Sequence, residues 1–397
     1  MNRSIDEAVI LAGGRGERLR PFTDTLPKPL YPINDLPFIE YLIKQIKGFG
    51  IRKIIILLGY LAPKVIEYLG NGKKYDVEII YDVTPESYDT LERLFHAKNK
   101  IQNNFLLMYC DNYCPIDFNA LVNNFYSHNA DIELSVYDNS DLYTKNNVLV
   151  NQNGMVEIYD KLRKASNLNG VEIGYSIVKR RVLDIPNISE TNFARGIFPY
   201  LALRNKLYAT FVFHRYYSIG SYERMQLTEQ FFKPKKVVFL DRDGTINQKA
   251  PKACYIEKSQ DFIWLDGAKE AIKLLNDNDV ITILITNQPG IARGNLTIQD
   301  LNSIHQKMQM DLKEIGARID YIYYCPHNWD EGCNCRKPKP GMLYQAQKDL
   351  SLDLTKCVMF GDDERDMEAA NSAMVKGILI TSKNPLIKAV KDYLERS

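Results

Sequence analysis

The sequence has little net charge and no long apolar segment. Its 397 residues include 51 Lys and Arg and 49 Asp and Glu, which leaves a formal net charge of +2. So small a charge gives no electrostatic reason to expect binding to nucleic acid or to a membrane surface. No apolar run approaches the roughly 18 residues of a membrane-spanning helix, and residues 1–6 lack the apolar core of a signal peptide. We therefore expect a cytoplasmic protein.

Cysteine is sparse, and its distribution argues against disulfide bonds. There are seven cysteines, an odd number, and three of them lie between residues 325 and 335 around a histidine. In a chain without an export signal, such clustering favours a metal site. Three thiolates and one imidazole form a closed tetrahedral set, so we predict a structural Zn²⁺ site that orders its own loop. The predicted ligands are Cys325, His327, Cys333 and Cys335.

The length of the chain predicts two domains, because 397 residues exceed one ordinary hydrophobic core. A helical pattern over Ser221–Phe232 is stopped by Pro234, and a new apolar strand begins directly afterwards. We therefore predict domains at residues 1–232 and 233–397. Apolar runs alternate with helical patterns in both, which predicts two doubly wound α/β domains.

In the second half, a short apolar strand over residues 237–240 leads directly into Asp241 and Asp243. Open α/β sheets bind ligands at the carboxyl ends of their strands. Two carboxylates two residues apart point the same way and repel each other unless a cation lies between them. Bound Mg²⁺ would keep Asp241 ionised as a nucleophile toward phosphorus and leave Asp243 as general acid and base. A solvated acidic turn is the alternative for such a pair taken alone.

Three later strand ends supply what this pair needs. Thr286 follows a second apolar strand and can donate to a phosphoryl oxygen, and Lys337 leaves the cysteine-rich loop as a cation for the same group. Asp362 follows a third strand and offers another carboxylate to Mg²⁺. Asp366, one helical turn later, is expected to order the start of a helix. Local capping by Thr286 and a solvated basic turn at Lys337 are the alternatives.

These residues follow separate strands in the order of the four motifs of the haloacid dehalogenase phosphatases, which residues 235–380 resemble. Within that superfamily, the segments 241–247 and 286–294 and the cysteine loop resemble the D-glycero-D-manno-heptose 1,7-bisphosphate phosphatases. Histidinol-phosphate phosphatases share the loop and are the alternative. The resemblance implies attack by Asp241 on the 7-phosphate, with Thr286 and Lys337 holding the phosphoryl group and Mg²⁺ on Asp241, Asp243 and Asp362. The predicted substrate-binding residues are Tyr255, Asn287, Gln288, Arg293 and Arg336. Asp363 departs from the lysine usual in the heptose enzymes.

The first half opens with a strand that runs into a glycine-rich turn, followed by Pro27, Lys28 and Pro29. Glycines let a backbone present its N–H groups to phosphate, and Arg18 and Lys28 can neutralise the phosphate charge. This half, to about Phe232, resembles the sugar-1-phosphate nucleotidyltransferases, which have a Rossmann-type fold. The resemblance implies that a nucleoside triphosphate is held by Leu11, Ala12, Gly13, Gly14, Gly16, Arg18, Lys28 and Asp111, with Mg²⁺ on Asp111.

The departures from that family concern its metal and sugar sites. Ser218 stands where the family has a second metal-binding aspartate, and Asp160 replaces a glutamate. A hydroxyl is a poor Mg²⁺ ligand, so this half either still transfers a nucleotidyl group, or binds nucleotide without turnover, or is purely structural. In the first case the two halves form one enzyme. The phosphatase makes heptose 1-phosphate, and the transferase, most simply a guanylyltransferase, joins it to a nucleotide to give activated heptose for surface polysaccharide.

Overall fold

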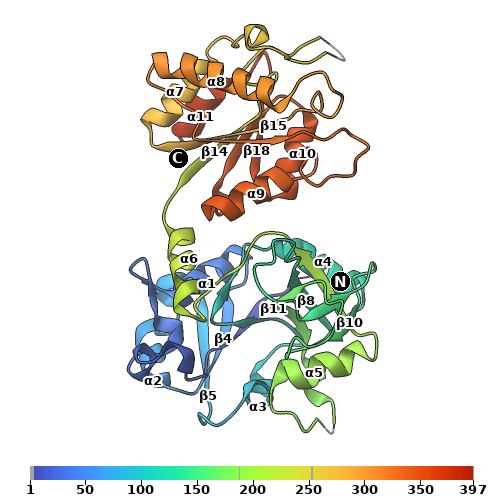
Figure 1. Ribbon diagram of the computed structural model, residues 1–397. Coiled ribbons are helices and arrows are strands. Elements are labelled where there is room, and N and C mark those ends of the chain that lie inside the picture. The colour runs from blue at the N-terminus through green and yellow to red at the C-terminus, as the bar shows by residue number, and fades with distance from the viewer. Residues whose placement is uncertain (1–3, 187, 252–253, 397) are drawn as a thin grey trace. The chain divides into compact units, whose positions relative to one another are not determined.

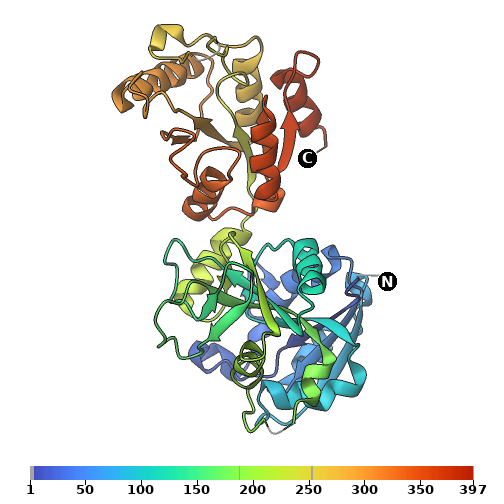
Figure 2. The ribbon, with the colours of Figure 1, turned by 90° about the vertical axis from the view of Figure 1, so that its right-hand side faces the viewer.

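The computed structural model describes residues 4–186, 188–251 and 254–396, and the chain divides into two compact units, Met1–Phe232 and Lys233–Ser397 (Figures 1 and 2). The predicted α/β class is confirmed, because each unit holds a central sheet covered by helices on both faces. Among the described residues, no helix combines the length and the apolar character needed to cross a bilayer.

The first unit is built on a seven-stranded sheet with the order β12-β8-β11-β6-β1-β4-β5. Its strands are β1 (Glu7–Leu11), β4 (Lys53–Leu58), β5 (Glu78–Val83), β6 (Asn104–Tyr109), β8 (Ile132–Tyr137), β11 (Val171–Lys179) and β12 (Leu207–Val212). Strand β11 runs antiparallel to both of its neighbours, and the other pairs are parallel. The three short pairs are β2 (Pro32–Ile33) with β3 (Leu36–Pro37), β7 (Asn112–Tyr113) with β13 (Tyr217–Ser218), and β9 (Val148–Val150) with β10 (Val156–Tyr159).

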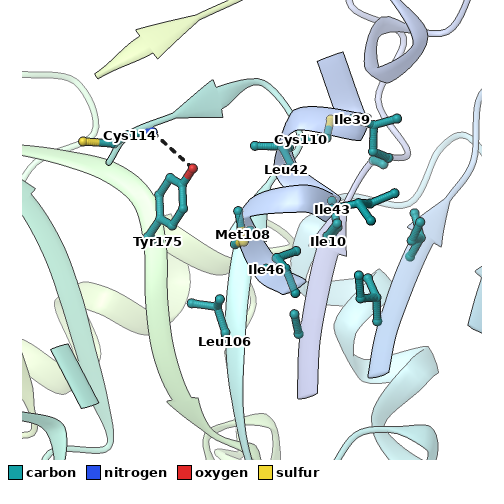
Figure 3. Packing of buried hydrophobic residues seen from close by; sticks show 14 of the residues in the cluster. Ile10, Ile39, Leu42, Ile43, Ile46, Leu106, Met108, Cys110, Cys114 and Tyr175 are labelled. Carbon is teal, nitrogen blue, oxygen red and sulfur yellow. Dashed lines mark hydrogen bonds between the residues drawn. The ribbon is translucent and has the colours of Figure 1, made fainter. Parts of the chain in front are cut away.

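Successive residues of a strand point to opposite faces of its sheet, so the all-apolar strands of the first unit serve two cores. One core holds the helices α1 (Phe38–Gly48), α2 (Ala62–Leu69) and α4 (Phe118–Ser127), and the other holds α3 (Thr90–Ala97) and α5 (Phe193–Ala202). Figure 3 shows the apolar side of α1 lying over β1 and β6, through Ile39, Leu42, Ile43 and Ile46 against Ile10, Leu106 and Met108. The unit ends with α6 (Tyr222–Phe232).

The second unit has a five-stranded, fully parallel sheet with the order β16-β15-β14-β17-β18. Its strands are β14 (Lys236–Leu240), β15 (Val280–Asn287), β16 (Tyr321–Cys325), β17 (Val358–Gly361) and β18 (Lys376–Leu379). One face is covered by α7 (Ala268–Asp277), α8 (Ile298–Glu314) and α11 (Leu386–Leu394), and the other by α9 (Gly341–Leu350) and α10 (Glu364–Ser372).

The strand order decides where the active-site residues meet. The central strand β14 lies between β15 and β17, so Asp241, Thr286 and Asp362 emerge at neighbouring positions on one edge of the sheet. Thr297 and Asp300 form a capping box at the start of α8. Strand β15 runs on through Asn287 and so includes Thr286.

Candidate functional site

Three carboxylates meet at the carboxyl edge of the second unit's sheet. Oxygens of Asp241, Asp362 and Asp366 all lie within 4.8 Å of one another. Asp241 follows β14, Asp362 follows β17, and Asp366 lies in the first turn of α10. The predicted Mg²⁺ set differs in one member, because it contained Asp243 where the structure brings in Asp366. Asp366 also has its predicted role at the helix start, since its Oδ2 accepts from the Asp363 N–H at 3.2 Å.

Lys337 is buried among these carboxylates. Its Nζ lies 2.5 Å from Asp241 Oδ1 and 2.7 Å from Asp366 Oδ1, and it donates to the Ile285 carbonyl at 3.0 Å. The backbone of Lys337 is held by the side chain of Asn287, which donates to the Lys337 carbonyl and accepts from its N–H, both at 3.0 Å. The amide of Asn287, predicted to bind substrate, is therefore used to position Lys337.

The electrostatics at Asp241 show why a cation is needed beside it. Burial raises the pKa of Asp241 to about 7, Lys337 opposes the increase, and Asp366 adds to it. A carboxylate nucleophile must be ionised to attack phosphorus. Because this pKa already includes the effect of Lys337, a divalent cation bound beside Asp241 would be the group that returns it to its charged form.

Asp243 lines the same cavity but does not belong to the three-carboxylate group, and it is held by its own partners. It accepts from Arg242 Nη2 at 2.9 Å, from Asn247 Nδ2 at 3.0 Å and from Gln288 Nε2 at 3.1 Å. Burial raises the pKa of Asp243, but Arg242 and these hydrogen bonds outweigh it, so the net pKa is lowered. Gln288 also donates to Thr286 Oγ1 at 2.8 Å, which links Asp243 to the predicted phosphoryl ligand.

The cavity above these groups has a volume of about 270 Å³. The predicted residues that line it are Asp241, Asp243, Tyr255, Thr286, Asn287, Gln288, Arg336, Lys337 and Asp362. The exposed Arg293 is not part of the lining. Its guanidinium donates to the hydroxyl of Tyr255 and, at 2.9 Å, to Asn328 Oδ1, so it supports Tyr255 from outside.

Asp362 has one oxygen that the surrounding protein leaves unsatisfied. Lys249 Nζ lies 2.5 Å from its Oδ2, whereas its buried Oδ1 has no hydrogen-bond partner among the described residues. A buried carboxylate oxygen without a donor fits a site for a hard cation that prefers oxygen ligands. Next to it, Asp363 forms a two-pronged ion pair with Arg365, both contacts at 2.9 Å. Lys249 and Arg365 therefore bring positive charge to the place where the heptose enzymes usually carry a lysine.

The four cysteine-loop residues come together as predicted. Their candidate ligand atoms all lie within 4.8 Å of one another. Cys325 Sγ is 3.6 Å from both Cys333 Sγ and His327 Nδ1, and His327 Nδ1 is 3.2 Å from Cys335 Sγ. Four ligands at zinc bond lengths of about 2.3 Å for sulfur would be separated by about 3.8 Å in a tetrahedron, close to these distances. The donor set and the spacing fit zinc.

His305, on α8, makes stability depend on pH. Burial lowers the pKa of His305 to about 4, Arg242 lowers it further, and Asp243 opposes the shift. The folded protein keeps this ring neutral between pH 6.5 and 4 while the unfolded chain takes up a proton, so stability falls as the pH falls through that range. We expect His305→Leu to reduce this loss by about 1 kcal/mol per pH unit. The free energy of unfolding in urea, measured from pH 4 to 8 for both proteins, tests this prediction. Parallel plots of that free energy against pH would contradict it.

The glycine-rich turn of the first unit borders a cavity of about 370 Å³. Seven of the eight residues predicted to hold a nucleotide line it, namely Leu11, Gly13, Gly14, Gly16, Arg18, Lys28 and Asp111. Ala12 does not, because it is buried and its N–H donates to the Leu57 carbonyl at 2.9 Å. Lys28 Nζ lies 2.5 Å from Asp111 Oδ2. Burial raises the pKa of Asp111, but Lys28 and the more distant Arg18 and Lys161 outweigh it, so the net pKa is lowered and this carboxylate is ionised.

Arg93 of α3 explains one glycine of the turn. Its buried guanidinium donates to the Leu58 carbonyl at 2.7 Å and to the Gly13 carbonyl at 3.3 Å. A Cβ on Gly13 would lie 2.5 Å from Arg93 Cζ, so any other residue there would force the Arg93 guanidinium to move. The Arg93 guanidinium thus holds the glycine-rich turn through the Gly13 carbonyl and also lines the 370 Å³ cavity.

A second cavity of about 470 Å³ adjoins the first and shares Arg18, Tyr109, Asp111 and Gly220 with it. Ser218 lines this second cavity and is held beside Asp111, since it pairs with Asn112 and the Ile219 N–H donates to the Asp111 carbonyl at 3.0 Å. Asp160 does not line it. The carboxylate of Asp160 instead accepts from the N–H groups of Leu162, Lys164 and Ala165 and so shapes a turn.

Three residues escaped the reasoning from sequence. Arg242 lies between Asp241 and Asp243, just after β14, where it is fully buried and its guanidinium donates to Asp243. Arg93 and Lys249 come from segments without a recognisable motif. Alternation along an extended strand end is the signal that could have placed Arg242, whereas nothing local marks the other two.

The two halves of the chain match different families. Residues 7–162 match the family described as Nucleotidyl transferase, and residues 236–374 match the one described as Polynucleotide kinase 3 phosphatase. HddC from Yersinia pseudotuberculosis has a similar solved structure, with 22% identity and a TM-score of 0.51 over 58% of this chain and 100% of its own. That likeness shows a shared fold.

The second half also has similar relatives. The D-glycero-beta-D-manno-heptose-1,7-bisphosphate 7-phosphatase of Haemophilus ducreyi is 40% identical over 162 residues, which cover 39% of this chain and 87% of that protein. The protein of the same name from Helicobacter pylori strain 26695 is 41% identical over 152 residues, covering 38% of this chain and 86% of its own length. Both resemblances drawn from the sequence are confirmed.

Proposed function

We propose, since the chain belongs through its second unit to the family of D-glycero-beta-D-manno-heptose-1,7-bisphosphate 7-phosphatases, that this unit removes the 7-phosphate of a heptose 1,7-bisphosphate. The observation that carries the proposal is the position of Lys337 between Asp241 and Asp366 at one side of the cavity. A buried ammonium there holds the nucleophile in place and faces the incoming phosphoryl group.

The reaction proceeds in two steps on Asp241. Its oxygen bonds to phosphorus while the bond from phosphorus to the sugar oxygen breaks, and the sugar leaves with a proton supplied through Asp243. Water then attacks the phosphorus, Asp243 accepts a proton from it, and phosphate leaves Asp241. The lowered pKa of Asp243 suits the second step, and its three hydrogen-bond donors keep its position constant through both.

Two metals belong to this proposal. Mg²⁺ would be held by Asp241, Asp362 and Asp366, where the unpaired Asp362 Oδ1 offers a ligand, and when bound it offsets the negative charge of the carboxylates and the phosphate. Zn²⁺ would be held by Cys325, His327, Cys333 and Cys335 as a structural ion.

Phosphorus NMR of the purified chain with heptose 1,7-bisphosphate and Mg²⁺ tests the substrate. We expect the 7-phosphate signal to disappear and the 1-phosphate signal to persist. Histidinol phosphate, run in parallel, represents the alternative phosphatase. Faster release from histidinol phosphate, or loss of the 1-phosphate first, would contradict the proposed substrate.

The first unit is proposed to transfer a nucleotidyl group to the resulting heptose 1-phosphate. An oxygen of the sugar phosphate bonds to the α-phosphorus of the nucleoside triphosphate, the bond between the α-phosphorus and its bridging oxygen breaks, and pyrophosphate leaves. Two adjoining cavities that share Arg18 and Asp111 support this, because a transfer between two phosphates needs both substrates to meet at one cation site. We propose GTP as the donor.

Asp111→Asn tests the transfer. We expect pyrophosphate release to fall by roughly 100-fold or more, because the variant removes the carboxylate that the two cavities share. Phosphate release from heptose 1,7-bisphosphate should be unchanged, and Asp76→Asn at an exposed position serves as the matched control. Assays with each of the four triphosphates identify the donor. If the unaltered chain binds a triphosphate but releases no pyrophosphate, the first unit is a binding module.

A further inference from the structure

The larger of the two adjoining cavities, with about 470 Å³, holds an excess of positive charge. Four cations line it, namely Arg18, Lys161, Arg163 and Arg224, against two carboxylates, those of Asp111 and Glu172. Asp111 is already paired with Lys28. None of the four cations has a carboxylate within 4.0 Å among the residues that the structure describes, whereas Arg15, Arg195 and Arg215 of the same unit do. Cations gathered without counter-charges repel each other, so the cavity is built to receive an anion.

Arg224 is the one of these four cations whose guanidinium packs against two tyrosine rings. Its guanidinium carbon lies 4.1 Å from the ring centre of Tyr143 and 5.4 Å from that of Tyr216, and its Nη2 donates to the Tyr143 carbonyl at 3.4 Å. Arg215 differs from Arg224 in its charge balance. Its guanidinium carbon also lies over the Tyr143 ring, 4.5 Å from the ring centre, but its Nη2 is paired with Asp141 Oδ2 at 2.6 Å. Stacking on rings fixes a guanidinium in place without cancelling its charge.

The backbone ties Arg224 to the shared edge of the two cavities. Arg224 lies in the first turn of α6, and its N–H faces Ser221 Oγ at 3.4 Å. That helix follows directly on β13, whose Ser218 and the next residue are bonded to the segment that carries Asp111. These contacts place the start of α6 next to the segment that carries Asp111, and Asp111 and Arg224 line the same cavity.

We propose that Arg224 binds the phosphate group of the sugar-phosphate acceptor and so sets the specificity of the first unit for phosphorylated sugars. This inference rests on the proposed nucleotidyl transfer. A guanidinium offers donors that match the oxygens of a phosphate. Nη1 of Arg224 is buried and has no hydrogen-bond partner among the described residues, so it is the donor that a bound phosphate would satisfy. Arg163, whose Nη1 donates to Thr144 Oγ1 at 3.0 Å, and Lys161 add charge from the opposite turn.

The test compares full-length Arg224→Met and Arg224→Lys with the unaltered chain. Arg181→Met is the control, because Arg181 is 62% exposed, pairs with Asp131 and lines neither cavity. In Arg224→Met we expect the KM for heptose 1-phosphate to rise by about tenfold or more, with the KM for GTP changed less than about twofold. Arg224→Lys keeps the charge, so its KM for heptose 1-phosphate should lie between those of the unaltered chain and Arg224→Met. Melting temperatures check that the fold is kept.

The outcomes separate the inference from the proposed transfer. An unchanged KM for heptose 1-phosphate, or equal increases for both substrates, overturns the role of Arg224. If the unaltered chain releases no pyrophosphate, the proposed transfer is wrong. The role of Arg224 is then tested by calorimetric titration of Arg224→Met and of the control with heptose 1-phosphate. Weaker binding in Arg224→Met than in the control supports the inference, and equal binding overturns it. Any binding to the second unit is common to all variants and cancels in the comparison.

Discussion

Asp241→Asn is expected to lower phosphate release from heptose 1,7-bisphosphate by roughly 10⁴-fold or more, because the amide cannot form the bond to phosphorus that splits the reaction into two steps. The remaining groups cannot replace it. Asp362 and Asp366 belong to the proposed cation site, and Asp243 is turned toward Arg242. The measurement is phosphate release at saturating Mg²⁺ and substrate.

The fold should tolerate this change, so a loss of activity can be assigned to chemistry. Asparagine has nearly the shape of aspartate, and burial already disfavours the charged form of Asp241. Lys337 keeps its second ion pair, with Asp366 at 2.7 Å. Asp277→Asn, at a half-exposed position on α7, is the matched control. Brief incubation with ³²P-labelled substrate should label the unaltered chain and not Asp241→Asn; retention of more than about a tenth of the activity would rule out Asp241 as the nucleophile.

The parts of this site that could be predicted from the sequence are those that follow strands. An apolar run buried in a parallel sheet must end at the sheet's edge, so the residues after it gather there whatever the intervening helices do. For that reason Asp241, Thr286 and Asp362, though far apart in the chain, line one cavity. The cysteine loop was predictable for a different reason, since its ligand types and spacing restrict the metal that it can hold.

What escaped prediction depends on side-chain direction and on contacts between distant segments. The sequence did not show that Arg242 would hold the carboxylate of Asp243, or that the first turn of α10 would bring Asp366 to 2.7 Å from Lys337. The use of Asn287 to hold the backbone of Lys337 joins residues 50 positions apart. No local pattern encodes such a contact, because it arises only when β15 and the cysteine loop are packed together.

Loss of the metal from the cysteine loop is the second large effect, and it should reach the phosphatase through Lys337. Between the end of β16 at Cys325 and the start of α9 at Gly341 the chain has no helix or strand. Local hydrogen bonds, such as that from the Gly341 N–H to the Asn334 carbonyl at 3.1 Å, hold parts of this segment, and bonds to a metal would tie its four ligands together. Lys337 follows Cys335 by two residues and must keep its Nζ 2.5 Å from Asp241. We expect Cys333→Ser to lower kcat for phosphate release by roughly 100-fold. The remaining activity should be preserved by the contact of Asn287 with the Lys337 backbone.

The measurement pairs zinc content with activity in the same samples. The unaltered chain should contain one zinc, Cys333→Ser much less, and Cys357→Ala a full complement with normal activity. Cys357 is the matched control because it is a buried cysteine of the same unit, and its thiol contacts the Asp353 carbonyl at 3.3 Å. Chelation followed by excess Mg²⁺ should leave the unaltered chain inactive until Zn²⁺ is added back. Full activity of the zinc-free chain would show that the Asn287 contact alone positions Lys337, because the buried ammonium would then keep its place beside Asp241 without the metal loop.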